Sequence, residues 1–330
     1  MGASPAFTVD TITEPLDARI FRMVDGTFQA PLYLNDDGEV GSTLRIDGFG
    51  IPTNEGDFFT AHYRCVIPYA ASTADPARIS LYGHGLLGSH TEVDAGNIRD
   101  MSNEHNMVFC ATDWTGFMED DVDTVLRVLQ DFSVFPDFID RQHQSIVNFL
   151  ALGRLMLHAD GFAAHPAFQS AGQPLIDTSD LFYDGNSQGG ILGGVLAAFA
   201  QDVTRFSLGV PGMNYSTLLN RSIDFIAFDV LLSNAYDNST DRNLLLSMGQ
   251  VLWDRTDPNG HVRHVLSDPY ANTPAKKALY QVAFSDHQVA PVTVEIMART
   301  NGASIHQPAL SPGKVVPEVE PYYDLSLIHI

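Results

Sequence analysis

A serine in a glycine-rich turn is the residue with the clearest chemical potential in this sequence. Ser187 stands in Gly185-Asn186-Ser187-Gln188-Gly189, a Gly-x-Ser-x-Gly pentapeptide. A short apolar, strand-like stretch (181–183) precedes it, and a helix-like run rich in Ala, Leu and Gly (191–200) follows it. A strand that turns sharply into a helix exposes a serine hydroxyl at the helix N-terminus, and the glycines remove side chains that would collide there. The pattern predicts Ser187 as a nucleophile, the alternative being a glycine-rich turn without chemistry.

A second glycine-rich loop, His84-Gly85-Leu86-Leu87-Gly88, ends a short apolar strand well before the serine. Acyl transfer to a serine needs two backbone N–H groups that bind the developing oxyanion. We expect these to be the amides of Gln188 and Leu86. The loop has neither the Gly-x-Gly-x-x-Gly pattern nor the Lys-Ser/Thr ending of phosphate-binding loops. We expect His84 to hold the loop at the substrate site rather than to act as a base.

An acidic residue follows another strand-like stretch, 279–284. Asp286 comes directly after this stretch, and a helix-like run begins near Val289. A carboxylate at the end of a strand can orient a catalytic histidine and stabilise its cationic form. Asp286 is therefore the candidate acid, and a helix-capping role is an alternative that is compatible with it.

These motifs together resemble the α/β-hydrolase superfamily. The order of strand, His-Gly-x-x-Gly loop, strand, helix, strand, Gly-x-Ser-x-Gly and helix is similar to that family, and the His-Gly-Leu-Leu-Gly loop resembles that of bacterial lipases and esterases. The resemblance covers roughly residues 60–310. It implies an α/β fold with a mostly parallel central sheet, helices on both faces of that sheet, and catalytic residues in the order serine, acid, histidine.

The family order requires the catalytic histidine to follow Asp286. His287 is too close to the acid along the chain, so His306 is the candidate base within the sequence. His329 belongs to the ending 325–330, which resembles the translation of an adapter used in DNA sequencing. We therefore expect native coding to stop near Asp324, and the alternative to His306 is a histidine beyond the end of this chain.

Two further regions are candidates for contact with a substrate. Trp114 and Phe117 follow a strand-like stretch that contains Cys110, and they are expected to line the substrate site together with His84 or to cover the core. An apolar run at 223–232 has helical spacing and is expected to form the core of a cap, its alternative being a lid against which a hydrophobic ester packs.

The organisation predicted from these patterns has one central domain with an insertion. The predicted segments are a β-rich N-terminal segment (1–60), an α/β-hydrolase core (61–211 and 276–324), a helical cap insertion (212–275) and a non-native tail (325–330).

Composition narrows the range of partners and cofactors. Eighteen Lys and Arg face 40 Asp and Glu, which gives a formal charge of −22, and such a surface repels nucleic acid. No apolar run is long enough for a stable membrane anchor, and the first residues lack the pattern of a signal peptide. The native location stays open, and a secreted or periplasmic protein is compatible with the sequence.

The two cysteines, Cys65 and Cys110, form no Cys-x-x-Cys pattern and have no histidine cluster beside them, so we expect no metal site and no cofactor. The interpretation we favour from the sequence is two buried free thiols. A disulfide is the alternative, and it would indicate an oxidising compartment.

The sequence thus predicts hydrolysis of a small-molecule or polymeric carboxylic ester through an acyl-enzyme on Ser187. Peptidase or acyltransferase chemistry on the same residues is an alternative. A second alternative is a binding protein that keeps the fold without a functional base. The oligomeric state is left open.

Overall fold

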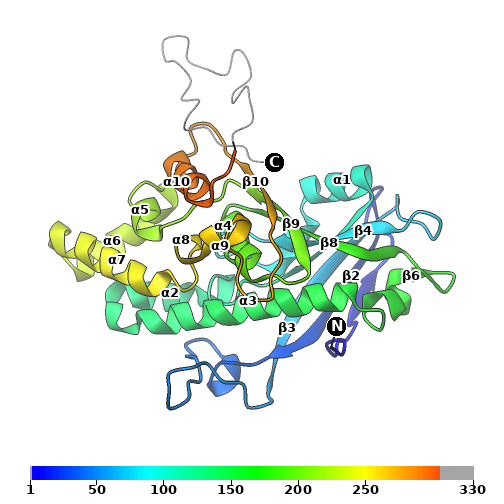
Figure 1. The fold of residues 1–330 in the computed structure, drawn as a ribbon, viewed down its shortest axis with the longest axis horizontal. Helices are drawn as coiled ribbons and strands as arrows, with labels where there is room; N and C mark the ends of the chain where they lie inside the picture. Colours follow the sequence, from blue (N-terminus) through cyan, green and yellow to red (C-terminus); the bar gives the residue numbers. More distant parts are fainter. Residues whose placement is uncertain (1, 305–330) are drawn as a thin grey trace, which may run out of the picture. The chain divides into compact units, whose positions relative to one another are not determined.

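The computed structural model describes residues 2–304, and a large mixed sheet organises them (Figure 1). The sheet contains eight strands in the order β1-β2-β3-β5-β4-β8-β9-β10. These strands are β1 (Thr11–Thr13), β2 (Ile20–Pro31), β3 (Phe58–Pro68), β4 (Ala77–Gly83), β5 (Met107–Thr112), β8 (Ile176–Asn186), β9 (Val203–Gly209) and β10 (Lys277–Gln281). Two short strands, β6 (Gln169–Ser170) and β7 (Gln173–Pro174), pair separately as a hairpin.

The type of strand pairing changes along this order, from antiparallel to parallel. β1, β2 and β3 pair antiparallel with one another, and β3 also pairs antiparallel with β5. β4 and β5 run parallel, as do β9 and β10. The mostly parallel α/β sheet predicted from the sequence is confirmed.

Helices alternate with the later strands, as the sequence pattern predicts for parallel strands. The α-helices are α1 (Gly96–His105), α2 (Val122–Gln130), α3 (Phe135–Leu157), α4 (Gln188–Phe199), α5 (Tyr215–Leu219), α6 (Ile226–Ala235), α7 (Ser239–Trp253), α8 (Pro258–His261), α9 (Arg263–Leu266) and α10 (Pro291–Asn301). The 3-10 helices are η1 (Asp36–Gly38), η2 (His90–Asp94), η3 (Glu119–Asp121), η4 (Phe132–Val134), η5 (Phe162–Ala164), η6 (Pro166–Phe168) and η7 (Ile223–Phe225). The segment predicted as a helical cap, 212–275, contains α5 to α9 and η7.

The chain divides into two compact units. Of the described residues, the first contains 2–124 and 136–184, and the second contains 125–135 and 185–304. A cluster of apolar side chains in the first unit includes Ile20, Val66 and Phe109, on strands β2, β3 and β5. In the second unit Phe225, Leu232 and Leu246 form a cluster that joins η7, α6 and α7. The predicted boundaries at residues 60, 211 and 275 are not tested by this division and stay predictions.

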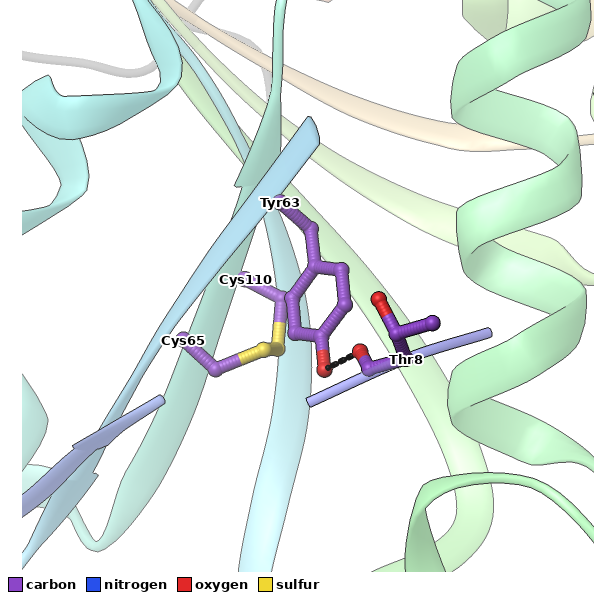
Figure 2. The surroundings of a disulfide bond; sticks show 4 residues. All are labelled: Thr8, Tyr63, Cys65 and Cys110. Atoms are coloured by element: carbon purple, nitrogen blue, oxygen red, sulfur yellow. Dashed lines mark hydrogen bonds between the residues drawn. A yellow bond between two sulfur atoms is a disulfide. The ribbon is translucent and has the colours of Figure 1, made fainter. Parts of the chain in front are cut away.

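A disulfide joins Cys65 on β3 to Cys110 on β5 (Figure 2). The antiparallel register of these strands places the two cysteines directly opposite each other, with 4.1 Å between their Cα atoms. Tyr63, two residues from Cys65, donates a hydrogen bond from its hydroxyl to the carbonyl oxygen of Thr8 at 2.9 Å. The interpretation of two free thiols was therefore wrong, because it considered each strand alone and not the register between them.

Within residues 2–304, no helix combines the length and the apolar character that a membrane crossing requires.

Candidate active site

Ser187 occupies the junction between β8 and α4 in an unusual backbone conformation. Its φ is 58° and its ψ is −121°, values that a residue with a side chain rarely adopts. Its amide donates a hydrogen bond to the carbonyl oxygen of Gly209 at 3.0 Å, and its carbonyl accepts one from the amide of Ile191 at 3.0 Å. The first bond ties the turn to the end of β9 and the second begins the hydrogen bonding of α4. This is the sharp strand-to-helix turn that the pentapeptide predicts.

Glycines allow the backbone segments around this turn to approach closely. A Cβ atom added to Gly190 would overlap the carbonyl oxygen of Gly209. One added to Gly209 would overlap the side-chain oxygen of Asn186. Asn186 precedes Ser187 in the sequence, and Gly209 accepts the hydrogen bond from the Ser187 amide. The glycines at these two positions are therefore part of the geometry that holds the serine.

Gln188 begins α4, and its side chain is buried. Its amide is a first-turn N–H of a helix, which has no acceptor inside that helix. It has no acceptor among residues 2–304, so it is available to bind an oxyanion. The side-chain amide of Gln188 donates to the hydroxyl of Tyr215. Burial, the largest cause, raises the pKa of Tyr215 well above its usual value, so this hydroxyl is neutral.

Tyr215 was not singled out from the sequence, although it contacts the first residue of α4. Its ring stacks on that of Trp253 with 4.1 Å between ring centroids. It also lines a narrow crevice without room for a water molecule, together with Ile191, Gly212, Met213 and Leu218. The only sequence signal was its place in the segment after β9, so it could be found only from the folded chain.

The candidate acid, Asp286, lies in the loop after β10, in the same unit as Ser187. Its Oδ1 atom accepts hydrogen bonds from the amides of Gln288 and Val289 at 2.8 and 3.0 Å. No partner is found for its Oδ2 atom among the described residues. One oxygen therefore shapes the loop before α10, while the other is available to a histidine.

The strand ends that carry Ser187 and Asp286 are aligned by backbone hydrogen bonds. Ser187 follows β8 and bonds to Gly209 at the end of β9, and the amide of Val210 donates to the carbonyl oxygen of Gln281 at the end of β10 at 2.8 Å. β9 and β10 are parallel. Because parallel strands end at the same edge of a sheet, the candidate nucleophile and the candidate acid share the carboxyl edge.

The candidate base, His306, lies outside the described residues, so its position relative to Asp286 stays a prediction. His287 is exposed, and its carbonyl oxygen accepts a hydrogen bond from the amide of Ile223 at 2.8 Å. That bond attaches the loop after β10 to the start of η7.

The predicted oxyanion loop lies in the first unit, after β4. Leu86 is 39% exposed, and its amide has no intramolecular acceptor within the part of the chain that the structure describes. Leu87 has a φ of 49°, and the amide of Gly88 donates to the carbonyl oxygen of Gly85 at 3.3 Å. The loop is thus a tight turn in which the amides of Leu86 and Leu87 have no acceptor among the described residues, and the amide of Leu86 is the candidate oxyanion donor.

His84 anchors the start of this loop. Its ring is fully buried; Nδ1 bonds to the carbonyl oxygen of Gly85 at 2.8 Å and Nε2 accepts from the amide of Trp114 at 2.8 Å. These partners require a neutral ring with its proton on Nδ1. Burial is the largest cause that lowers the pKa of His84, which favours the same neutral form. The structure gives His84 the loop-holding role, and contact with a substrate stays a prediction.

Trp114 and Phe117 are buried in the first unit. The Trp114 ring stacks on Phe149 with 3.7 Å between centroids, and the Phe117 ring meets Phe138 edge-on at 4.8 Å. These contacts agree with the alternative of core cover that the sequence left open. A role of either ring in binding a substrate stays a prediction.

Two observations decide the fold. The serine has the strained conformation of a nucleophile elbow between β8 and α4. The sheet carries antiparallel strands at one edge, followed by the order β5-β4-β8-β9-β10. This chain has the α/β-hydrolase fold. The hydrolase resemblance noted in the sequence therefore extends to the arrangement of strands.

Comparison with known proteins gives structural likeness without sequence likeness. No protein-family model matches the chain, and no curated protein matches its sequence. The chain is similar in structure to acetyl xylan esterase 1 from Thermoanaerobacterium sp., with 13% identity, a TM-score of 0.48 and coverage of 90% of this chain and 89% of that one. An acetyl xylan esterase from Paenibacillus sp. R4 gives 12% identity, a TM-score of 0.47 and coverages of 90% and 88%. An S-formylglutathione hydrolase from Agrobacterium tumefaciens gives 13% identity, a TM-score of 0.45 and coverage of 88% of this chain and 86% of that one.

Proposed function

We propose that this hydrolase-fold protein cleaves carboxylic esters, of small molecules or of polymers, through an acyl-enzyme on Ser187. The observation that carries the proposal is the backbone of Ser187. This residue stands between a strand and a helix and has a φ of 58°. Strained backbone of this kind concentrates at functional sites, because folding alone gives no reason to keep it. The N-terminus of α4 adds a partial positive charge where negative charge develops.

In the proposed reaction the Ser187 hydroxyl attacks the ester carbonyl while a histidine removes its proton. His306, or a histidine beyond the end of this chain, is that base, and Asp286 orients it through Oδ2. The amides of Leu86 and Gln188 bind the oxyanion. As this intermediate collapses, the C–O bond to the alcohol breaks and the protonated histidine gives its proton to the leaving oxygen. Water, deprotonated by the same histidine, then attacks the acyl-enzyme, and the acid leaves as Ser187 regains its proton.

The test is hydrolysis of p-nitrophenyl butyrate, with labelling by a fluorophosphonate probe in parallel. Ser187→Ala removes the nucleophile, and we expect kcat to fall on the order of 10⁶-fold, to background, together with loss of labelling. Ser247→Ala is the matched control, because Ser247 is an exposed serine on α7 whose hydroxyl bonds only to the carbonyl oxygen of Asn243. Labelling or turnover that survives Ser187→Ala would exclude Ser187 as the nucleophile.

A further inference from the structure

The loop that carries Leu86 encloses a carboxylate. Glu92, at the third position of η2, accepts a hydrogen bond at Oε2 from the amide of Gly85 at 2.9 Å. A Cβ atom on Gly85 would lie 3.5 and 3.7 Å from the two carboxylate oxygens. One on Gly88 would overlap Oε1 and stand 3.0 Å from the carboxylate carbon. The carboxylate of Glu92 therefore occupies the space that a side chain at Gly88 would fill, and it lies within van der Waals contact of a Cβ position at Gly85.

Neighbouring bonds hold Glu92 in this position. Its own amide donates to the carbonyl oxygen of Ser89 at 3.0 Å. Next to it, the amide of His90 donates to Oδ1 of Asp113 at 2.7 Å, and Nδ1 of the same histidine lies 2.9 Å from both oxygens of Asp113. Burial alone would raise the pKa of Asp113, but hydrogen bonds and charge from His90 outweigh it and lower that pKa. An ionised Asp113 thus fixes the helix on which Glu92 stands.

The second end of the turn is also attached. The carbonyl oxygen of Gly88 accepts a hydrogen bond from the amide of Glu119 at 3.1 Å, and Gly88 pairs with Met118 as an isolated parallel bridge. Glu92 is the group that bonds inside the turn, whereas these contacts act from outside. With the Gly85 amide bonded to Glu92 and the Gly88 amide bonded to Gly85, the amides of Leu86 and Leu87 are the donors of the turn that have no acceptor among the described residues.

We propose that Glu92 is the positioning residue of the oxyanion loop: its carboxylate holds the turn Gly85–Gly88 so that the Leu86 amide is presented to the oxyanion. This inference rests on the proposed esterase function. It assigns Glu92 no contact with the substrate. Its role needs an acceptor oxygen at this position and not a negative charge, because the partner is a neutral backbone amide.

The first experiment compares Glu92→Leu with Glu92→Gln in the full chain. Glutamine keeps an acceptor oxygen of similar reach, whereas leucine fills the space without one. We expect Glu92→Leu to lower kcat about 10- to 100-fold with KM changed less than about threefold, since a displaced donor loses transition-state binding and not substrate binding. Glu92→Gln is expected to stay within about threefold of the parent.

A second measurement does not depend on turnover. Hydrogen exchange followed by mass spectrometry on a peptide covering 83–89 reports the opening of the turn. We expect exchange in Glu92→Leu to be at least about tenfold faster there, with α4 unchanged, and parent-like exchange in Glu92→Gln. Unchanged exchange in Glu92→Leu would overturn the proposal even where no ester is turned over.

A third variant pair tests the enclosed geometry directly. Gly88→Ala places a methyl group against the carboxylate, and Glu92→Ala removes that carboxylate. If the carboxylate lies inside the turn, the double variant loses no more activity than the worse single variant. Independent losses that multiply would contradict the enclosed position. Parent turnover that survives Ser187→Ala would instead overturn the proposed function, so the two failures are distinguishable.

Discussion

The two glycine-rich turns of this protein are held by different means. The Ser187 elbow is fixed by backbone groups, with a hydrogen bond from its amide to Gly209 and a close approach that Gly190 permits. The turn after β4 is fixed by side chains, through the His84 ring at its start and the Glu92 carboxylate inside it. The glycine spacing that permits the elbow can be recognised in the sequence, whereas no pattern of residue types indicates that the Glu92 side chain turns back onto the amide of Gly85.

The largest effect is expected from a methyl group added at the elbow. Gly190→Ala places a Cβ against the carbonyl oxygen of Gly209, which belongs to a buried strand end and cannot move away cheaply. We expect kcat to fall by about 100-fold or more, because the serine is displaced from the attacking geometry. The assay is p-nitrophenyl butyrate turnover.

The control for that variant is Gly48→Ala. A Cβ atom at Gly48 meets no atom within 4 Å, so this variant adds the same methyl group without a clash. We expect parent-like activity and thermal unfolding from it. Equal activity in Gly190→Ala and the parent would show that the elbow does not depend on its backbone contact.

The next largest effect concerns the stability contributed by Asp257, which bonds to the amide of Tyr215, the residue that contacts Gln188. Asp257 is fully buried; Oδ1 accepts from the amides of Asn214 and Asn259, and Oδ2 accepts from the amide of Tyr215 and the side-chain amide of Gln250. Asp257→Asn replaces one acceptor oxygen by an NH2 group and leaves two buried donors unpaired. We expect the free energy of unfolding to fall by about 2–4 kcal/mol, measured by urea denaturation.

Asp254→Asn is the matched control for this change. Its Oδ1 atom accepts hydrogen bonds from the side-chain amides of Gln250 and Asn259, each at 2.8 Å. An asparagine keeps that oxygen, so we expect a change below about 1 kcal/mol. A loss as large as that of Asp257→Asn would point to charge, and not to the number of acceptors, as the cause.

The smallest effect concerns pH and the other turn. The folded protein holds His84 neutral because burial lowers its pKa, while in the unfolded chain the ring titrates near 6.5. Below that pH the unfolded state binds a proton that the folded state does not, so stability is full above about pH 6.5 and decreases as the pH falls. Thermal unfolding between pH 7.5 and 5 measures this decrease. We expect His84→Gln, which has no titrating group, to show a shallower slope.

The positions of the main elements could be predicted from local sequence. The strand before Ser187 and the helix after it were predicted from apolar runs and glycine spacing. The candidate acid, Asp286, was predicted from its place after the strand β10. These features are local because each depends on a few consecutive residues. The strained φ of Ser187 was implied by the same pentapeptide.

Features that depend on contacts between distant segments could not be predicted. The Cys65–Cys110 bond required the register of β3 against β5, which no single strand encodes. The buried Asp257 and the tyrosine beside Gln188 belong to a segment whose helices the pattern indicated, but whose contacts it did not. Glu92 is close to this loop in the sequence, but the types of its neighbouring residues do not indicate that its carboxylate turns back into the loop.

The disulfide also affects how the chain would come apart. It joins residues separated by 45 positions, and the turn that carries Leu86 lies within that closed stretch. A protease that cuts once in this turn would leave both pieces covalently attached, so a non-reducing gel would show a single species of unchanged mass. Only a reducing agent would release the two fragments, and damage to the turn would go unnoticed without it.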